Sequence, residues 1–250
     1  DDVESRGLGD VYKRQTYNDI LLNHLIKHIS KGRILDLAGG TGYNSNFIQE
    51  YNDYSIDLVD ISKQMLKQCQ NSSINKVCKG MLEFLTVQES CCYDAIVCTW
   101  ALMYEQPQKV LNQCQRLLKN GGYLYILVND QQTLPQIRKI YPKLLIEYVG
   151  SINKLMFDLP MPNNAQQLER WAKKAGLKNC RVTSKKQEFY FTDWNRAAKF
   201  VTSTGALAGY DAMLDLKNEK IFNTLVEQLQ KFFTKPCITH HFVMGIFKKG

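Results

Sequence analysis

The stretch Ile34-Leu35-Asp36-Leu37-Ala38-Gly39-Gly40-Thr41-Gly42 decides the fold of this 250-residue chain. An apolar run ends in an acid and then in a turn dense in glycine, which lets a backbone pass close to a ligand. A second apolar run, Ser55–Ile61, contains Asp60, eighteen residues beyond Gly42. An acid at the tip of the next strand suits two ribose hydroxyls. Together these features predict a nucleoside-cofactor site at the carboxyl edge of a parallel sheet.

The order of acid and glycines indicates which nucleoside cofactor fits. The dinucleotide fingerprint G-x-G-x-x-G places a pyrophosphate at a helix N-terminus. Here the turn begins with the carboxylate of Asp36, and the glycines follow as Gly39, Gly40 and Gly42. An anion at that point repels a pyrophosphate but attracts an ammonium or sulfonium group. The sign of the charge therefore favours S-adenosylmethionine over NAD.

These residues resemble motif I of the class I S-adenosylmethionine-dependent methyltransferases. The family's usual D-x-G-x-G-x-G is present with Ala38 in place of the first glycine. The resulting D-x-A-G-G-T-G is also similar to the form found in quinone-biosynthesis methyltransferases. Three later segments resemble the family in its order and spacing, namely Val59–Leu66, Tyr93–Leu102 and Val110–Leu124. Four ordered segments make the resemblance specific.

Alternating apolar runs and helical periods predict an α/β fold. We expect a Rossmann-like, mostly parallel seven-stranded sheet with helices on both faces and an antiparallel final hairpin. The strands are expected near Arg33–Leu37, Tyr54–Asp60, Lys76–Lys79, Tyr93–Thr99, Tyr123–Val128, Lys178–Phe191 and His241–Lys248. The main helices are expected near Thr16–Ser30, Tyr43–Glu50, Ser62–Gln70, Gln108–Lys119, Leu134–Tyr148, Ala165–Ala175, Asp193–Ser203 and Asn218–Phe233.

The chain is expected to form a single methyltransferase domain over residues 16–250. Cap insertions at about 131–163 and 191–236 would cover the acceptor. Residues 1–15 lack any periodicity and resemble translated sequencing-adapter read-through, so a non-native leader is expected there.

The resemblance implies roles for the residues that match the family's motifs. Asp36 would orient the glycine turn and the methionine amine, and Asp60 would bind the ribose hydroxyls. Ile61 would pack on the adenine face. The remaining cofactor-binding residues are expected to be Ala38, Gly39, Gly40, Gly42, Met81, Leu82 and Thr99.

One departure concerns the adenine. The family often carries an acid after the third strand that accepts a hydrogen bond from the adenine amine, and here Met81 stands there. Adenine would then be held by apolar contact from Met81 and Leu82 and by backbone groups, unless Glu83 reaches it. The alternative interpretation of this segment is the start of a surface helix.

The acceptor side is expected to include Trp100, Tyr104 and Glu105, although core packing explains the two aromatic residues equally well. Methyl transfer is an in-line displacement that depends mainly on alignment, and a base is needed only for a protonated nucleophile. No catalytic residue is therefore assigned.

The best-matching acceptor is the free carboxylate of malonyl-acyl-carrier protein, a substrate of biotin synthesis. Asp130–Ile137, Leu159-Pro160 and Phe191–Ala206 resemble the methyltransferases that act on it, and Lys154 is the candidate for gripping the distal carboxylate. A quinone precursor or another small metabolite is the alternative acceptor. A further alternative is a protein that binds S-adenosylmethionine without catalysis.

Composition narrows the kinds of partner that the protein can have. A net charge of +8, spread over short lysine pairs, suits a solvated surface or an acidic partner such as a carrier protein. Nucleic acid is not expected as a partner, because no Asn-Pro-Pro-Tyr-like tetrad follows the fourth strand. No apolar run reaches the roughly 18 residues of a membrane span. The oligomeric state stays open.

The cysteines and histidines point to neither disulfides nor metal. The eight cysteines are scattered without a C-x-x-C pair, which predicts a cytoplasmic location. His24 and His28 have the i, i+4 spacing of metal ligands but lack a third ligand, which favours ordinary helix residues. No metal site is expected.

Overall fold

The computed structural model describes residues 16–152, 159–203, 207 and 210–250. These residues form two compact units. The sheet unit comprises the described residues up to 128, together with 160–184 and 243–250. The helical unit comprises the described residues of 129–159 and 185–242. The leader expected at residues 1–15 lies outside the described residues.

The sheet unit begins with a helix over residues 16–28. It continues with β1 (Arg33–Leu37), α2 (Tyr43–Gln49), β2 (Ser55–Asp60), α3 (Lys63–Leu66), β3 (Asn75–Cys78), α4 (Met81–Thr86), β4 (Tyr93–Thr99), the 3-10 helix η1 (Leu102–Tyr104), α5 (Pro107–Leu117), β5 (Leu118–Asn129) and α7 (Ala165–Lys174). The long strands β6 (Leu177–Tyr190) and β7 (Cys237–Lys249) contribute residues to both units.

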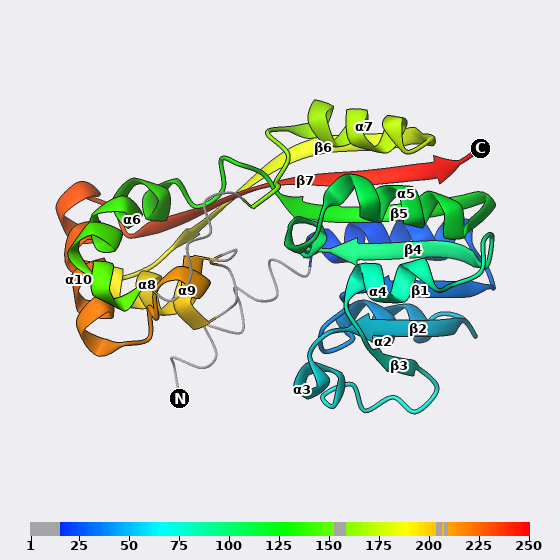
Figure 1. The fold of residues 1–250 in the computed structure, drawn as a ribbon, viewed down its shortest axis with the longest axis horizontal. Helices are drawn as coiled ribbons and strands as arrows, with labels where there is room; N and C mark the ends of the chain where they lie inside the picture. The colour runs from blue at the N-terminus through cyan, green and yellow to red at the C-terminus, as the bar shows by residue number, and fades with distance from the viewer. Residues whose placement is uncertain (1–15, 153–158, 204–206, 208–209) are drawn as a thin grey trace. The chain divides into compact units, whose positions relative to one another are not determined.

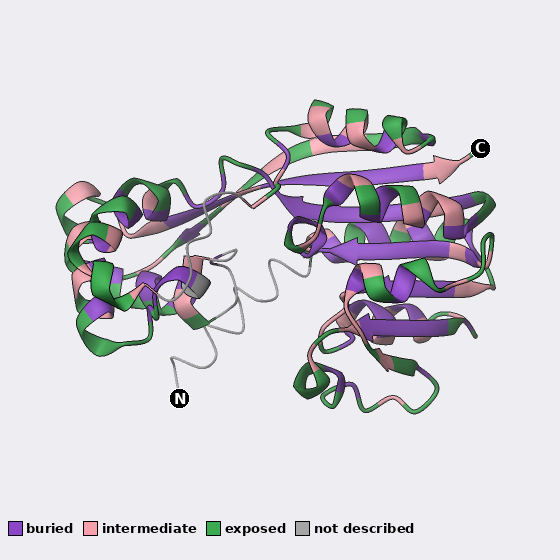
Figure 2. Ribbon diagram, viewed as in Figure 1, coloured by how far each residue is buried: buried purple, intermediate pink, exposed green. Residues whose placement is uncertain are grey.

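Within the described residues, seven strands form one sheet in the order β3-β2-β1-β4-β5-β7-β6. Strands β3, β2, β1, β4 and β5 are parallel to their neighbours, and the arrow of β7 runs opposite to that of β5 (Figure 1). The Rossmann-like fold with an antiparallel final hairpin is therefore confirmed. Its central strands are almost continuously apolar and buried (Figure 2), as expected for a parallel sheet covered on both faces.

Side-chain contacts show which helices cover which face of this sheet. The rings of Tyr123 and Tyr125 on β5 contact His24 of the helix 16–28. Cys98 on β4 instead lies close to Cys114 of α5. Tyr125 pairs with Val97, the neighbour of Cys98, and neighbouring residues of a strand point to opposite faces. The helix 16–28 and α5 therefore cover opposite faces of the sheet.

Several elements differ from their predicted bounds; β7, for example, begins at Cys237 rather than His241, and two further differences have a clear physical reason. Helix α3 ends at Leu66 rather than Gln70, because the next amides, of Gln68 and Cys69, bond to carbonyls three residues back and tighten the chain. Strand β5 begins at Leu118 rather than Tyr123, because Leu118 already pairs with Tyr93. The glycine pair expected to end the preceding helix therefore lies inside the strand.

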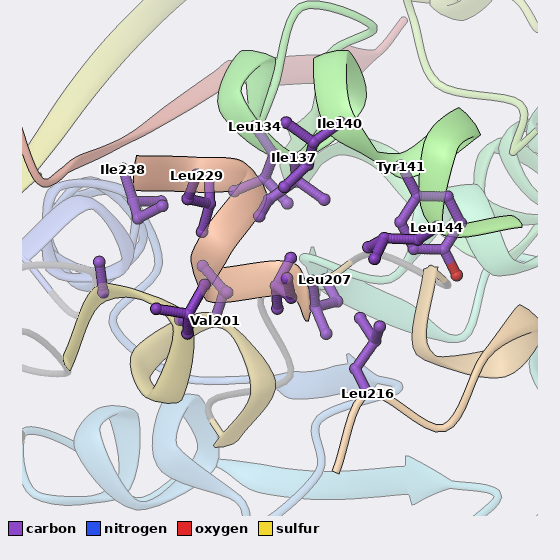
Figure 3. Close-up of a cluster of buried hydrophobic side chains, with 14 of the residues drawn as sticks. Leu134, Ile137, Ile140, Tyr141, Leu144, Val201, Leu207, Leu216, Leu229 and Ile238 are labelled. Carbon is purple, nitrogen blue, oxygen red and sulfur yellow. The ribbon is translucent and has the colours of Figure 1, made fainter. Parts of the chain in front are cut away.

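The helical unit has a core of its own. Its helices are α6 (Pro135–Glu147), the 3-10 helix η2 (Val149–Ser151), α8 (Trp194–Ser203), α9 (Tyr210–Met213) and α10 (Glu219–Phe232). Apolar side chains of α6, α8 and α10, and that of Leu134 just before α6, turn toward one another in Figure 3 and are buried; they include Leu134, Ile137, Ile140, Leu144, Val201 and Leu229. The short helix α9 was not expected from the sequence. That residues 131–163 and 191–236 cap an acceptor stays a prediction.

No helix among the described residues combines the length and apolar character that crossing a bilayer requires.

Replacing Ile137 with alanine should test the core of the helical unit. The side chain is fully buried, so its loss should lower the free energy of unfolding by about 2–5 kcal/mol. Ile146→Ala is the matched control, because Ile146 lies on the same helix with 78% of its surface exposed. Urea unfolding followed by circular dichroism measures both. Equal losses in the two variants would contradict the packing described here.

Candidate cofactor site

The candidate site lies where the sheet changes winding direction. β1 lies between β2 and β4, so the chain runs outward from β1 to one side and continues from β4 on the other. In parallel α/β sheets, ligands bind outside the carboxyl ends of the strands at such a switch point. The turn after β1, Asp60 at the end of β2 and Thr99 at the end of β4 all lie along this edge.

Asp36 is fully buried at this edge and holds the start of α2. Its carboxylate accepts hydrogen bonds from the Asn44 amide at 3.1 Å, the Ser45 hydroxyl at 2.7 Å and the Ser45 backbone N–H at 3.1 Å. Burial raises the pKa of Asp36, while these hydrogen bonds act in the opposite direction. The contacts support its expected role in orienting the glycine turn. A contact with the methionine amine stays a prediction.

The backbone of the turn between β1 and α2 is left-handed at several positions. Ala38, Gly40 and Gly42 have φ values of 55°, 60° and 81°. A Cβ on Gly39 would lie 2.4 Å from a Leu58 methyl group, so close packing excludes a side chain there. A Cβ on Gly40 would meet nothing within 4 Å. The turn is thus packed against the sheet at Gly39 and open over Gly40, where a ligand can approach the backbone.

Asp60 connects this turn to the segment after β2. One carboxylate oxygen accepts the N–H of Gly40 at 2.9 Å, and the other accepts the N–H of Ser62 at 2.8 Å. Each carboxylate oxygen can accept more than one hydrogen bond, so the half-buried group also suits ribose hydroxyls. Beside it, the side chain of Ile61 is 78% exposed, which suits an apolar platform for a planar base. The expected neighbours Gly40, Asp60 and Ile61 are therefore brought together.

The segment after β3 begins a helix, as the alternative interpretation stated. Gly80 caps α4, and the Glu83 side chain accepts the Gly80 N–H at 3.3 Å. Met81 is buried with 7% exposed, and Leu82 is half-buried. Glu83 is thus engaged at the start of its own helix, while Met81 and Leu82 follow the carboxyl end of β3, next to β2.

The end of β4 carries the acceptor-side candidates. Thr99 is buried, and Trp100 follows it with φ 63°, an uncommon conformation for a bulky residue. Tyr104 ends η1 with 54% of its surface exposed, and Glu105 is half-buried. The remaining candidate, Lys154, lies outside the described residues.

Sequence reasoning missed the polar residues that support this edge. Asn18, on the helix 16–28, donates to the side chain of Asn44 at 2.8 Å and accepts from the indole N–H of Trp100 at 3.0 Å. Asn44 and Ser45 follow the glycine turn directly. The sequence did carry one signal for these residues. Asn44 and Ser45 are small polar residues at the start of a helix, where side chains often form local hydrogen bonds.

The histidines have packing roles in the described part of the chain. The rings of His24 and His28 stack with centroids 3.8 Å apart, and His24 Nδ1 lies 3.1 Å from the Tyr125 hydroxyl. Burial, followed by the charge of His28, lowers the pKa of His24. His240 is buried edge-to-face against Phe189. The described residues contain no cluster of three His, Cys, Asp or Glu side chains suited to a metal ion.

Residues 35–126 match the family described as "Methyltransferase domain". Among curated proteins, the "Ubiquinone/menaquinone biosynthesis C-methyltransferase UbiE" of Francisella tularensis subsp. novicida is 27% identical over 165 residues, which cover 62% of this chain and 63% of that protein. The "Ubiquinone biosynthesis O-methyltransferase" of Coxiella burnetii is 28% identical over 178 residues, covering 66% and 73%. The chain thus matches less than two thirds of the first relative's length.

A solved structure with the same fold is geranyl diphosphate methyltransferase in complex with S-adenosylmethionine. It superposes with a TM-score of 0.61 at 13% identity, covering 99% of this chain and 90% of that one. The family match and the curated relatives bear out the prediction of a methyltransferase domain and, with it, of S-adenosylmethionine as the cofactor. Residues 35–126 of this chain are thus similar to a methyltransferase domain.

Proposed function

We propose that this chain transfers the methyl group of S-adenosylmethionine to a small phenolic acceptor of the quinone-precursor class. The observation that carries the cofactor assignment is the arrangement of groups along the carboxyl edge of the sheet. The open backbone at Gly40, the carboxylate of Asp60 and the exposed side chain of Ile61 stand next to one another. These groups match the methionine, ribose and adenine parts of the cofactor in that order.

The residues present fit this cofactor by their chemistry. A side chain at Gly40 would fill the space that the methionine part needs. Asp60 supplies acceptors for two hydroxyls, and Ile61, Met81 and Leu82 supply apolar surface for the base. When bound, S-adenosylmethionine supplies an electrophilic methyl group at its sulfonium.

The protein's contribution is then mostly alignment. The hydrogen bonds that Asp60 accepts from the Gly40 and Ser62 amides fix the turn before any ligand arrives, so little order remains to be gained on binding. Trp100 and Tyr104 follow β4 on the same edge and would orient the acceptor. Holding the reacting atoms about 3–3.5 Å apart and in line supplies the main rate enhancement for such a displacement.

Two observations favour a quinone precursor over malonyl-acyl-carrier protein. The D-x-A-G-G-T-G turn resembles the form found in quinone-biosynthesis methyltransferases, and the names of both curated relatives place those proteins in quinone biosynthesis. The segment Asp130–Ile137, which supported the carrier-protein substrate, starts α6 and buries Leu134 and Ile137 in the core of the helical unit. Packing in the helical unit therefore accounts for that pattern of residues.

The location is a separate proposal. All eight cysteines are free, which supports a reducing, cytoplasmic location.

Gly40→Ala should weaken cofactor binding without a matching loss of fold. The left-handed backbone costs an alanine about 1–2 kcal/mol of stability, and its methyl group enters the space given to the methionine part. Gly121→Ala is the matched control, because Gly121 has φ 79° and lies near the amino end of β5, away from the carboxyl edge. Calorimetry should show roughly tenfold weaker S-adenosylmethionine binding in Gly40→Ala only. Equal affinities in both variants would remove the basis for this placement.

The acceptor class is tested by turnover. With S-adenosylmethionine present, formation of S-adenosylhomocysteine should be measured with a prenylated hydroquinone and, separately, with malonyl-acyl-carrier protein. We expect methyl transfer to the hydroquinone. Turnover of the carrier protein alone would overturn the acceptor assignment, and binding of the cofactor without turnover of either would favour a binding protein.

A further inference from the structure

Asn18 is a buried polar residue for which the cofactor site as described has no use. It lies on the helix 16–28 with 7% of its surface exposed. Its side-chain amide donates to Asn44 Oδ1 at 2.8 Å and lies 3.4 Å from Thr99 Oγ1. Its oxygen accepts the indole N–H of Trp100 at 3.0 Å. One side chain thus joins the N-terminal helix to the start of α2 and to the end of β4.

The direction of these hydrogen bonds follows from the acceptor oxygens of Asp36. Asp36 Oδ1 accepts from the amide nitrogen of Asn44, so this nitrogen faces Asp36. The oxygen of Asn44 then faces Asn18, which must turn its own nitrogen toward it. The oxygen of Asn18 is consequently left facing the indole of Trp100. The buried carboxylate thereby orients each group of the relay, which we define as Asp36, Asn44, Asn18 and Trp100.

Trp100 needs such a support because its backbone is strained. A non-glycine residue in the left-handed region costs about 1–2 kcal/mol, and neighbours must hold it there. Its backbone N–H donates to the Leu127 carbonyl at 2.6 Å, which fixes the main chain. The bond to Asn18 fixes the plane of the indole. Backbone and ring are therefore held by separate partners.

We propose that Asn18 is a positioning residue for methyl transfer, which orients the indole of Trp100 relative to the glycine turn through the relay. This role rests on the proposed function, in which Trp100 borders the acceptor. It makes the N-terminal helix part of the reaction site, although none of its residues belongs to a family motif quoted above. Loss of Asn18 should remove this hydrogen bond of the indole N–H while leaving the turn, held by Asp36 and Asp60, in place.

The experiment uses the indole N–H signals of the full chain in ¹H–¹⁵N NMR spectra. The sequence has three tryptophans, so the Trp100 signal is assigned by its loss in Trp100→Phe. In Asn18→Leu this signal should move upfield, and its N–H should exchange with water about tenfold faster, as loss of one hydrogen bond implies. Asn23→Leu, on the exposed face of the same helix, is the matched control and should change neither property.

A second variant and a second measurement keep the test decisive. Asn18→Gln keeps both the donor for Asn44 and the acceptor for the indole and should retain the downfield signal, even if Asn18→Leu does not fold. An unchanged Trp100 signal in Asn18→Leu, or loss of the downfield signal in a folded Asn18→Gln, would overturn the proposal. Calorimetry with S-adenosylmethionine runs in parallel on the wild type and both variants. Failure of the wild type to bind the cofactor would overturn the proposed function, whereas the indole signals test the relay independently.

Discussion

The buried carboxylate of Asp36 is the constraint on which the site depends. Moving an ionised carboxylate out of water costs several kcal/mol, so it persists only where hydrogen bonds replace its hydration. Ser45 and Asn44 supply those bonds from the first turn of α2. Their donation ties the end of β1 to the start of α2 and thereby fixes the glycine turn between them. Burial raises the pKa of Asp36, while the hydrogen bonds from Asn44 and Ser45 act in the opposite direction.

The same charge organises its surroundings over several residues. Thr99 accepts a hydrogen bond from Asn44 at 3.0 Å, so the ends of β1 and β4 are joined by side chains as well as by the sheet. On the other side of β1, Asp60 bonds the open part of the turn at Gly40. The buried Asp36 thus holds the turn through the start of α2, and the half-buried Asp60 holds it through the Gly40 amide. A cationic sulfonium compound is the ligand class that such a negative edge attracts.

The strands that form the site were predictable because each is an apolar run that stops at an acid or a polar residue. β1 and β4 match their predicted bounds, and the parallel register brings Asp36 and Thr99 to one edge. The polar relay was not predictable, since Asn18 on an amphipathic helix has the pattern of a solvated residue. The end of α3 at Leu66 was not predictable either. Its local 3-10 bonds depend on backbone geometry that helical periodicity does not report.

The central claim is that the cofactor binds along the turn, Asp60 and Ile61. A crystal structure of the protein with S-adenosylhomocysteine measures this most directly. The account predicts the methionine part over Gly40, both ribose hydroxyls within hydrogen-bonding distance of the Asp60 carboxylate, and adenine against Ile61. A ligand bound at any other place, or ribose hydroxyls facing away from Asp60, would contradict it.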